Sequence, residues 1–352
     1  MHTNEFKKFN SLEYPYFIAD IAANHDGSIE RAKELIWLAK EAGADCAKFQ
    51  HFVAEKIVND AEFKKIESLE THQSSWSKSV SEIYDQYHFK RDWTVRIQEE
   101  CLKAEIDFSS TPYDYDAIKD LESLVPFFKI GSGDISWLEH IEDCLKTELP
   151  IVIATGASSP EDVERAMSLI GRYNNQHCIM QCNTNYTVEP DKIRFVNLNV
   201  LDDYKRKYPN AILGLSDHTT NYTSVLGAIA KGAKIIEKHF TDDNDRVGPD
   251  HKFAINPVNW RIMVDLSREL TDALGDGVKK IEENEKNAYI VQRRCCVSAK
   301  NLPKGHIIKE DDLKFLRPCP ENAVQPFDYK SIIGKELKVN IEENDAILWN
   351  YL

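Results

Sequence analysis

Short apolar segments alternate with helical patterns along most of the chain. The first segment, YFIADIA, is followed by SIERAKELIWLAKEAG, in which apolar residues recur at helical spacing and Gly43 suits a helix end. A second apolar segment, DCAKFQH, comes next. Six further apolar runs follow, at 106–110, 127–131, 150–156, 177–182, 211–216 and 234–240. The pattern therefore predicts eight strands, each followed by a connection long enough to cross over a sheet.

Nearly continuous apolar strands that alternate with helices are typical of a parallel sheet covered on both faces. Eight such units over roughly 270 residues favour an α/β fold of the closed (β/α)8, or TIM barrel, type. A doubly wound open sheet is the alternative, although it usually has fewer strands. We assign residues 1–275 to the barrel domain.

The pattern changes near residue 275. The stretch GDGVKKIEENEKNAYIVQ is polar and charged, which indicates a linker over 276–289 or an exposed helix. Residues 290–352 hold short alternating runs broken by PKG and by prolines, which predicts a small β-rich domain. A domain of about 60 residues has a small core, so we expect it to pack against another surface.

The composition is that of a globular protein, since 42% of the 352 residues are apolar and 29% are charged. The net charge of −14 argues against partners such as nucleic acid or an anionic membrane, so local cations must bind any anionic substrate. No apolar run reaches the ~20 residues that cross a bilayer, and MHTNEFKKFNSLEYPY lacks a signal-peptide core. We therefore expect a soluble, cytoplasmic protein. Its eight cysteines lack CxxC spacing and should be reduced, buried thiols.

Polar side chains follow the predicted strands at their carboxyl ends, where barrels of this type carry their active sites. They are Asp20; Lys48 and Gln50; Ser109 and Thr111; Lys129, Ser132 and Asp134; Thr155; Gln181, Asn183 and Tyr186; Ser216, Asp217 and His218; and Glu237, Lys238 and His239. Turns and helix caps account for several of these residues, but they account less well for lysines and histidines at the ends of apolar strands.

Two of the lysines, Lys48 and Lys129, lie within predicted strands and must reach an anion or solvent. Together with Ser132 and the backbone of GSG they predict a pocket for phosphate or carboxylate. His218 and His239 end the seventh and eighth predicted strands. Because neighbouring strands lie about 4.8 Å apart, these imidazoles could share one divalent ion such as Mn²⁺, Co²⁺, Fe²⁺ or Zn²⁺. The alternative is that both rings only form hydrogen bonds at the barrel mouth.

After the last predicted strand comes the polar stretch KHFTDDNDRVGPDHK. We interpret it as a lid that contributes Asp250 and Arg246. A solvated charge run explains DDNDR equally well.

The chain resembles the sialic acid synthase family, which comprises N-acetylneuraminate synthases and their legionaminic and pseudaminic acid relatives. The matching words are ANHDGSIERAKELI, EAGADCAKFQ, STPYD, FKIGSGD, ATG, QCNTNY, GLSDHT, EKHFTDD and GPDHK, in family order over residues 16–255. The tail, with LPKGHIIKEDDL, RP and IIGKEL, resembles the family's antifreeze-like (SAF) domain.

The resemblance implies an enzyme that condenses phosphoenolpyruvate with an open-chain amino sugar to a nine-carbon 2-keto acid and phosphate. It also implies a homodimer with swapped SAF domains and a divalent metal, Mn²⁺ above all, with Mg²⁺, Co²⁺ or Zn²⁺ as alternatives. On the positions that match, phosphoenolpyruvate is held by Lys48, Thr111, Lys129, Ser132 and Ser216, with Thr155 and Thr184 on or beside such positions. The metal ligands are His218 and His239, and the acceptor side is Gln50, Tyr186, Asp250 and Arg317, the last supplied by a partner subunit.

We expect Asp134 to handle the protons of water, and Asp20 to relay a proton or orient the metal ligands. Both are aspartates where the family usually has glutamate, which withdraws each carboxylate by one methylene. Lys78 stands nearest to the position of a sugar-binding asparagine, and PCPENAVQPFDY replaces a glycine-containing turn after Arg317. We therefore hypothesise an acceptor other than N-acetylmannosamine, such as an acidic or differently substituted sugar. The alternatives are another 3-deoxy-ulosonate synthase, a retro-aldol lyase and a non-catalytic sugar-phosphate sensor.

Overall fold

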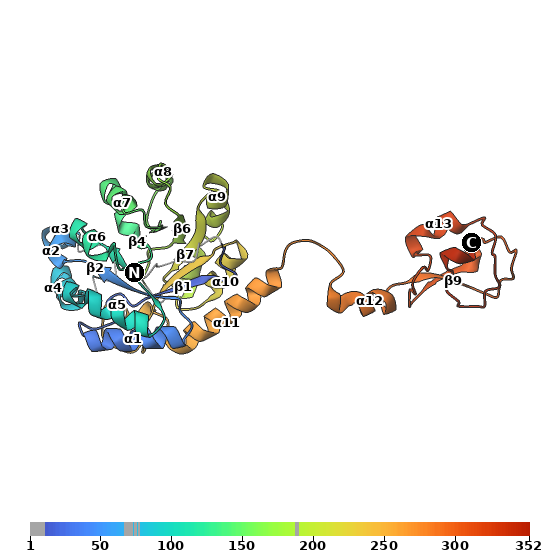
Figure 1. The fold of residues 1–352 in the computed structure, drawn as a ribbon, viewed down its shortest axis with the longest axis horizontal. Helices are drawn as coiled ribbons and strands as arrows, with labels where there is room; N and C mark the ends of the chain where they lie inside the picture. Colours follow the sequence, from blue (N-terminus) through green and yellow to red (C-terminus); the bar gives the residue numbers. More distant parts are fainter. Residues whose placement is uncertain (1–10, 67–72, 74–75, 77, 187–189) are drawn as a thin grey trace. The chain divides into compact units, whose positions relative to one another are not determined.

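The computed structural model describes residues 11–66, 73, 76, 78–186 and 190–352. The chain divides into two compact units, Met1–Gly275 and Asp276–Leu352 (Figure 1). The division falls at the glycine where the hydrophobic pattern of the sequence changes.

In the first unit, eight parallel strands of the described residues close into a barrel in chain order, β1 to β8. The strands are β1 Tyr16–Asp20, β2 Cys46–His51, β3 Asp107–Pro112, β4 Phe128–Ile130, β5 Ile151–Ala154, β6 His177–Cys182, β7 Ile212–Asp217 and β8 Ile235–His239. The predicted TIM barrel is confirmed, and each predicted strand is present.

The described α-helices of this unit cover the outside of the barrel (Figure 1). They are α1 Ile29–Glu41, α2 Ala54–Ile57, α3 Asp60–Lys65, α4 Val80–Tyr87, α5 Thr94–Lys103, α6 Tyr115–Leu121, α7 Leu138–Leu145, α8 Pro160–Ile170, α9 Val200–Lys207, α10 Thr223–Ala230 and α11 Pro257–Leu274. Their starts follow local rules. For example, Ser28 caps α1 by accepting the Arg31 N–H, and α8 has a Ser159–Asp162 capping box followed by Pro160.

Alternation of side chains along each strand separates two cores. Side chains facing the helices form the larger core, which includes Phe17, Phe49 and Leu215. Side chains of the opposite parity face the barrel axis. These form a second buried cluster of Tyr16, Ile18, Cys46, Phe127, Val152, Ala154, Cys178, Met180, Cys182, Ile212 and Ile235. Because this cluster fills the amino-terminal half of the barrel, polar inward residues occupy only its carboxyl end.

Within residues 276–352, all of which are described, two antiparallel strands pair, β9 Cys295–Ser298 and β10 Leu313–Leu316. Two short helices, α12 Lys286–Val291 and α13 Tyr329–Ile332, accompany them. Isolated bridges such as Leu302–Ile341 join the remaining segments. The unit has its own buried core of Cys296, Leu302, Ile308, Val324, Ile332, Leu337, Ile341 and Ile347. The small C-terminal domain predicted from the sequence therefore lies within this unit, which begins at Asp276.

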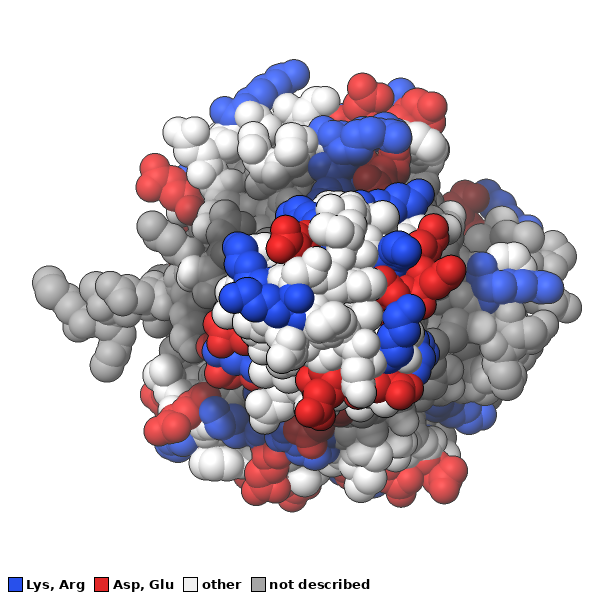
Figure 2. Space-filling model, turned by 90° about the vertical axis from the view of Figure 1, so that its right-hand side faces the viewer, with Lys and Arg blue, Asp and Glu red and all other residues white. Residues whose placement is uncertain are grey.

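Lys and Arg side chains are interspersed with Asp and Glu side chains over the face shown in Figure 2. In the described part of the chain, no helix is both long enough and apolar enough to span a lipid bilayer.

Candidate active site

The barrel registers bring the predicted polar residues to one mouth. Asp20 of β1 lies opposite Lys48 of β2 on one side and opposite His239 of β8 on the other. Ser216 of β7 lies opposite Glu237 of β8. Since these positions all have the inward parity, their side chains converge at the carboxyl end of the barrel.

Two buried lysines form the base of this mouth. Lys48 Nζ lies 2.7 Å from Asp20 Oδ2 and 3.9 Å from Glu237 Oε2, and Lys129 Nζ lies 3.4 Å from Glu237 Oε1. Ser216 Oγ donates to Glu237 Oε1 at 3.0 Å. All four charged groups are buried. Burial of two ammonium groups is therefore compensated by two carboxylates, which is the condition for keeping them charged inside a protein.

The charges of this cluster change the titration of its members. Burial alone would lower the pKa of Lys48, but Asp20 and Glu237 raise it. Burial likewise would raise the pKa of Glu237, but Lys129 and Lys48 lower it, so Glu237 stays ionised. For Asp20, burial and the Glu237 charge outweigh Lys48, and the pKa is raised. An anion that enters the mouth therefore meets Lys48, whose charged form is favoured, beside Lys129 in a site of low dielectric constant.

Two imidazoles lie beside the lysine cluster. The ring centroids of His218 and His239 are 5.4 Å apart, and Tyr186 packs edge-on against His218 at 4.5 Å. His218 Nδ1 donates to the Asn183 carbonyl at 3.0 Å, so in the neutral ring Nε2 carries the lone pair. His239 Nε2 lies 3.9 Å from Asp20 Oδ2. Paired imidazoles at one mouth, one of them bonded through Nδ1 to a backbone carbonyl, fit a divalent metal ion.

The described part of the mouth offers few protein ligands for such an ion. Among the residues that the structure describes, no three His, Cys, Asp or Glu side chains are grouped closely enough to hold an ion. The Cys182 thiol lies 3.8 Å from His218, but at Nδ1, the nitrogen that bonds the backbone. A metal here would have two protein ligands, His218 and His239, and would take its other ligands from water or substrate.

Carboxylates and phenols surround the outer part of the mouth. Asp250 Oδ2 lies 3.9 Å from His239 Nδ1 and accepts the Ala23 N–H at 3.2 Å. Burial raises the pKa of Asp250 to about 6, although the Ala23 hydrogen bond lowers it. Burial also raises the pKa of Asp134, against the effect of His140 and Lys129. Such half-buried carboxyl groups are suited to accepting and donating protons.

The other residues predicted for the barrel site also lie at its carboxyl end, but not all of their side chains face the mouth. Thr111 Oγ1 is 3.5 Å from Lys48 Nζ, and Gln50 has the inward parity opposite Thr111. Ser132 Oγ accepts the Gly156 N–H at 2.9 Å. A Cβ on residue 156 would lie 2.0 Å from Thr184 Oγ1 and 3.0 Å from Ser132 Oγ, so glycine lets these two hydroxyl groups approach each other.

The Thr155 hydroxyl is directed elsewhere. It donates to the Met180 carbonyl at 2.9 Å and accepts from Tyr204 of α9 at 2.9 Å, on the helix side of the strand. Lys78 is exposed and donates to Gln86 Oε1 at 2.7 Å. Arg317 is an exposed residue of the second unit.

Glu237 is the main site residue that the sequence reasoning did not single out. It is one of three polar residues at the end of the eighth predicted strand, with Lys238 and His239. Glu237 and His239 face inward from the same strand but have different roles. Glu237 neutralises the lysines, and His239 can bind a metal. Strand parity combined with the need to neutralise Lys48 and Lys129 would have found it.

Tyr84 of α4 was also missed. Burial and the Asp250 charge raise its pKa, with a smaller contribution from Asp134. Its phenol is therefore close to the carboxylates of the mouth, although α4 lies outside the barrel strands.

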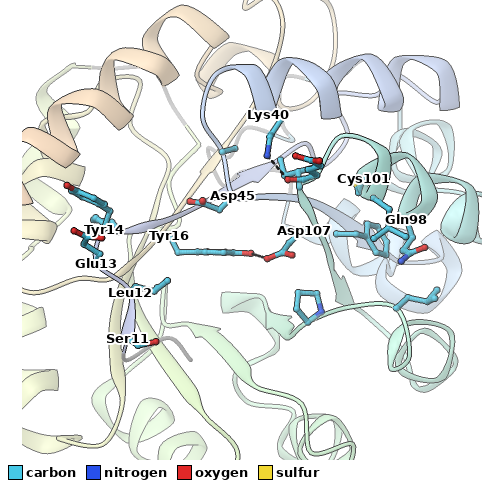
Figure 3. A pocket seen from close by; sticks show the side chains of 18 of the residues that line it. Ser11, Leu12, Glu13, Tyr14, Tyr16, Lys40, Asp45, Gln98, Cys101 and Asp107 are labelled. Carbon is cyan, nitrogen blue, oxygen red and sulfur yellow. Dashed lines mark hydrogen bonds between the residues drawn. The ribbon is translucent and has the colours of Figure 1, made fainter. Parts of the chain in front are cut away.

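A cavity of about 760 Å³ lies at the opposite, amino-terminal end of the barrel (Figure 3). Residues at or just before strand starts line it together with residues of helices and connections, and Tyr16 Oη donates to Asp107 Oδ2 at 2.5 Å within it. Asp45 accepts the Phe17 N–H at 2.8 Å. These groups join the strand starts, and the converging lysines and imidazoles are at the other end.

Comparison with protein families agrees with this arrangement. A model described as NeuB family matches residues 35–279, and a model described as SAF domain matches residues 293–352. The chain belongs to the NeuB family. The TIM barrel followed by a small SAF domain is the architecture expected from the sequence.

Two relatives of this NeuB protein match along nearly the whole chain. The N-acetylneuraminate-9-phosphate synthase of Homo sapiens is 32% identical over 338 residues, 96% of this chain and 92% of that protein. The N,N'-diacetyllegionaminic acid synthase of Legionella pneumophila is 31% identical over 359 residues, 99% of this chain and 98% of that protein.

Solved structures share the fold. The spore coat polysaccharide biosynthesis protein spsE of Bacillus subtilis has a TM-score of 0.61 and 27% identity, covering 96% of this chain and 95% of that one. The structure titled "putative spore coat polysaccharide biosynthesis protein E" from Chromobacterium violaceum has a TM-score of 0.77 at 20% identity, covering 96% of this chain and 99% of that one.

We expect the substitution Glu237→Gln to change both stability and anion binding. Two buried ammonium groups would face one carboxylate, so the free energy of unfolding should fall by about 3 kcal/mol. Phosphate should bind at the mouth about tenfold more tightly or better, because unit charges about 7 Å apart interact by about 2 kcal/mol at a dielectric constant near 20. Urea denaturation and titration calorimetry with inorganic phosphate measure the two effects.

Asp217→Asn is the matched control. Asp217 also pairs with a buried lysine, Lys238, at 2.6 Å, but this pair has the outward parity and bonds Ser224 of α10. The control should lose comparable stability and keep the phosphate affinity of the wild type. An unchanged phosphate affinity in Glu237→Gln would contradict the assignment of the mouth as an anion site.

Proposed function

We propose that the protein condenses phosphoenolpyruvate with an open-chain amino sugar aldehyde to give a 3-deoxy-2-ulosonic acid of the sialic acid type and phosphate. The observation that carries the proposal is the convergence of Lys48 and Lys129 with His218 and His239 at one barrel mouth. Cations for a phosphorylated enol and imidazoles for a metal are the two requirements of this reaction. Relatives named as synthases of N-acetylneuraminate 9-phosphate and of diacetyllegionaminic acid support the same class.

Lys48 and Lys129 are proposed to bind the phosphate and carboxylate of phosphoenolpyruvate. Thr111 and Ser216 lie beside these lysines and can donate hydroxyl hydrogen bonds to the same oxygens. In the free protein Asp20 and Glu237 neutralise the lysines, so on substrate binding the lysines would exchange these carboxylates for anionic oxygens of the substrate. Ser132 and Thr184, brought together over Gly156, extend the site on the β4 to β6 side.

His218 and His239 are proposed to hold a divalent ion, Mn²⁺ first among the candidates, which when bound polarises the acceptor aldehyde as a Lewis acid. Gln50, Tyr186 and Asp250 would orient the acceptor hydroxyl groups. Carbon 3 of phosphoenolpyruvate attacks the aldehyde carbon, and the aldehyde oxygen takes up a proton to become a hydroxyl group. Water adds at carbon 2 and gives up one proton. Cleavage of the bond between carbon 2 and the phosphate oxygen then releases phosphate, and the hydroxyl group at carbon 2 loses its proton to become the ketone. Asp134 would take the proton of that water, because its burial raises its pKa toward the working range.

The proposed oligomer is a homodimer in which the SAF domain of one subunit covers the mouth of the other. Arg317 would then reach the acceptor from the second copy of the chain. The proposal rests on the exposure of Arg317 and on the match of residues 293–352 to the SAF domain.

Incubation with phosphoenolpyruvate, Mn²⁺ and a panel of aldoses should release inorganic phosphate only with the true acceptor. The panel contains N-acylated hexosamines, both free and as their 6-phosphates. It also includes acidic sugars, because a cationic Lys78 would suit an acidic acceptor. Chelation should remove the activity, and His218→Ala or His239→Ala should lower kcat/KM by at least a hundredfold. Phosphate release and product mass spectrometry are the measurements.

Two results would reject the synthase. Binding of phosphoenolpyruvate without turnover of any aldose indicates a sensor, whereas pyruvate formed from a keto acid indicates a retro-aldol lyase. Full activity of both histidine variants would reject their assignment as metal ligands.

Mixing two inactive variants tests the swapped dimer. In a dimer of His239→Ala with Arg317→Ala, one barrel is intact and receives an intact SAF domain from its partner. Random mixing after subunit exchange should therefore restore about a quarter of the wild-type activity. A SAF domain that serves its own barrel would give no recovery, because each chain then carries a defect in its own site.

A further inference from the structure

The loop between β8 and α11, residues 240–256, carries Asp250 to the mouth. Its two ends meet, since the Ile255 N–H donates to the His239 carbonyl at 2.9 Å and the Thr241 N–H to the Ile255 carbonyl at 3.2 Å. Asn244 Nδ2 donates to the carbonyls of His251 and Ala254 at 2.9 and 2.7 Å. The base of the loop is therefore closed by its own hydrogen bonds.

His251, the residue after Asp250, anchors this loop to another one. Its ring is fully buried, at 0% exposure. Nδ1 lies 2.7 Å from Thr241 Oγ1, and Nε2 lies 2.9 Å from Asp26 Oδ1. Asp26 belongs to the loop between β1 and α1, the same loop whose Ala23 N–H donates to Asp250. The two neighbouring residues thus bind the β1–α1 loop at two points.

Two arginine contacts complete a closed circuit around Asp26. Arg31 Nε lies 3.0 Å from Asp26 Oδ2, and its terminal nitrogens bond both oxygens of Asp242 at 3.1 and 3.2 Å. Asp242 follows Thr241, the second partner of the His251 ring. A circuit of bidentate and buried bonds has one geometry, so it fixes the position of residue 251 between the loops.

The space around the His251 ring is also fixed. A Cβ on residue 248 would lie 2.6 Å from His251 Cδ2 and 2.9 Å from Nε2, closer than real Cβ contacts. Gly248 is therefore required for the ring to pack where Asp26 can accept its hydrogen bond.

We propose that His251 is a positioning residue of the acceptor site. Through its bond to Asp26 it holds the β8–α11 loop against the β1–α1 loop, and this holds the Asp250 carboxylate beside His239. The role in acceptor binding rests on the proposed function, whereas the coupling of the two loops is independent of it.

The substitutions His251→Asn and His251→Gln distinguish the contributions of the two ring nitrogens. The amide of Gln reaches the place of Nε2 and keeps the bond to Asp26, whereas the amide of Asn reaches only the place of Nδ1. His51 is the matched control, because it is equally buried and both of its nitrogens are bonded, to Ser110 and Thr94 at 2.7 and 2.8 Å. Its ring faces the helix layer and not the mouth.

Hydrogen–deuterium exchange tests the coupling without any turnover. Peptides that span residues 21–28 and 240–256 should exchange at least threefold faster in His251→Asn than in the wild type, including the Ala23 amide. His251→Gln and His51→Asn should leave both peptides near the wild-type rate. Unchanged exchange in His251→Asn, or equal acceleration in His51→Asn, would overturn the proposal.

Steady-state kinetics test the role in the acceptor site. His251→Asn should raise KM for the acceptor about tenfold or more and leave KM for phosphoenolpyruvate within about threefold. If His251 acts through Asp250, the double variant His251→Asn/Asp250→Ala should have the same KM for the acceptor as Asp250→Ala alone. Additive effects of the two substitutions on KM for the acceptor, or a parallel rise of KM for the acceptor and for phosphoenolpyruvate, would overturn the proposed role of His251 in the acceptor site.

A chain that turns over no aldose refutes the proposed function and leaves the exchange experiment to decide the loop coupling. Should His251→Asn fail to fold, Gly248→Ala displaces the same ring and carries the same expectations in both experiments.

Discussion

Two lysines buried at the carboxyl end of the barrel, Lys48 and Lys129, constrain the rest of the site. A buried ammonium group is tolerated only beside a carboxylate, so Asp20 and Glu237 must occupy neighbouring inward positions of β1 and β8. Those two positions adjoin His239, so the proposed metal site would lie against the proposed anion site. In the proposed reaction, the same register that neutralises the lysines in the free protein would bring a phosphorylated enol next to an activated carbonyl.

The fold could be predicted from the sequence because its signals are local. Apolar runs such as PIVIATG and KIIEKHF are long enough for strands and are separated by helical periods, and eight repeats leave a closed barrel as the natural solution. The C-terminal domain was harder. Only 295–298 and 313–316 form a ladder there, because PKG and other turns interrupt its remaining extended segments, which pair by isolated bridges.

The location of a residue at the mouth could be predicted where residue type and strand end coincide, as for Lys48 and His239. It could not be predicted where the deciding fact is a direction or a distant partner. Thr155 has the right position along its strand but bonds Tyr204 on the helix side. The role of Glu237 depends on Lys48 and Lys129, which come from two other strands. Tyr84 lies on helix α4 and not on a strand. Parity and register, which come from closing the barrel, decide these cases.

A crystal structure with Mn²⁺ and phosphoenolpyruvate, using the anomalous signal of manganese, tests the central claim most directly. The account predicts an anomalous peak between the imidazoles of His218 and His239, with the phosphate or carboxylate of phosphoenolpyruvate in contact with both Lys48 Nζ and Lys129 Nζ. Manganese bound elsewhere, or phosphoenolpyruvate bound in the amino-terminal cavity beside Tyr16, would contradict it.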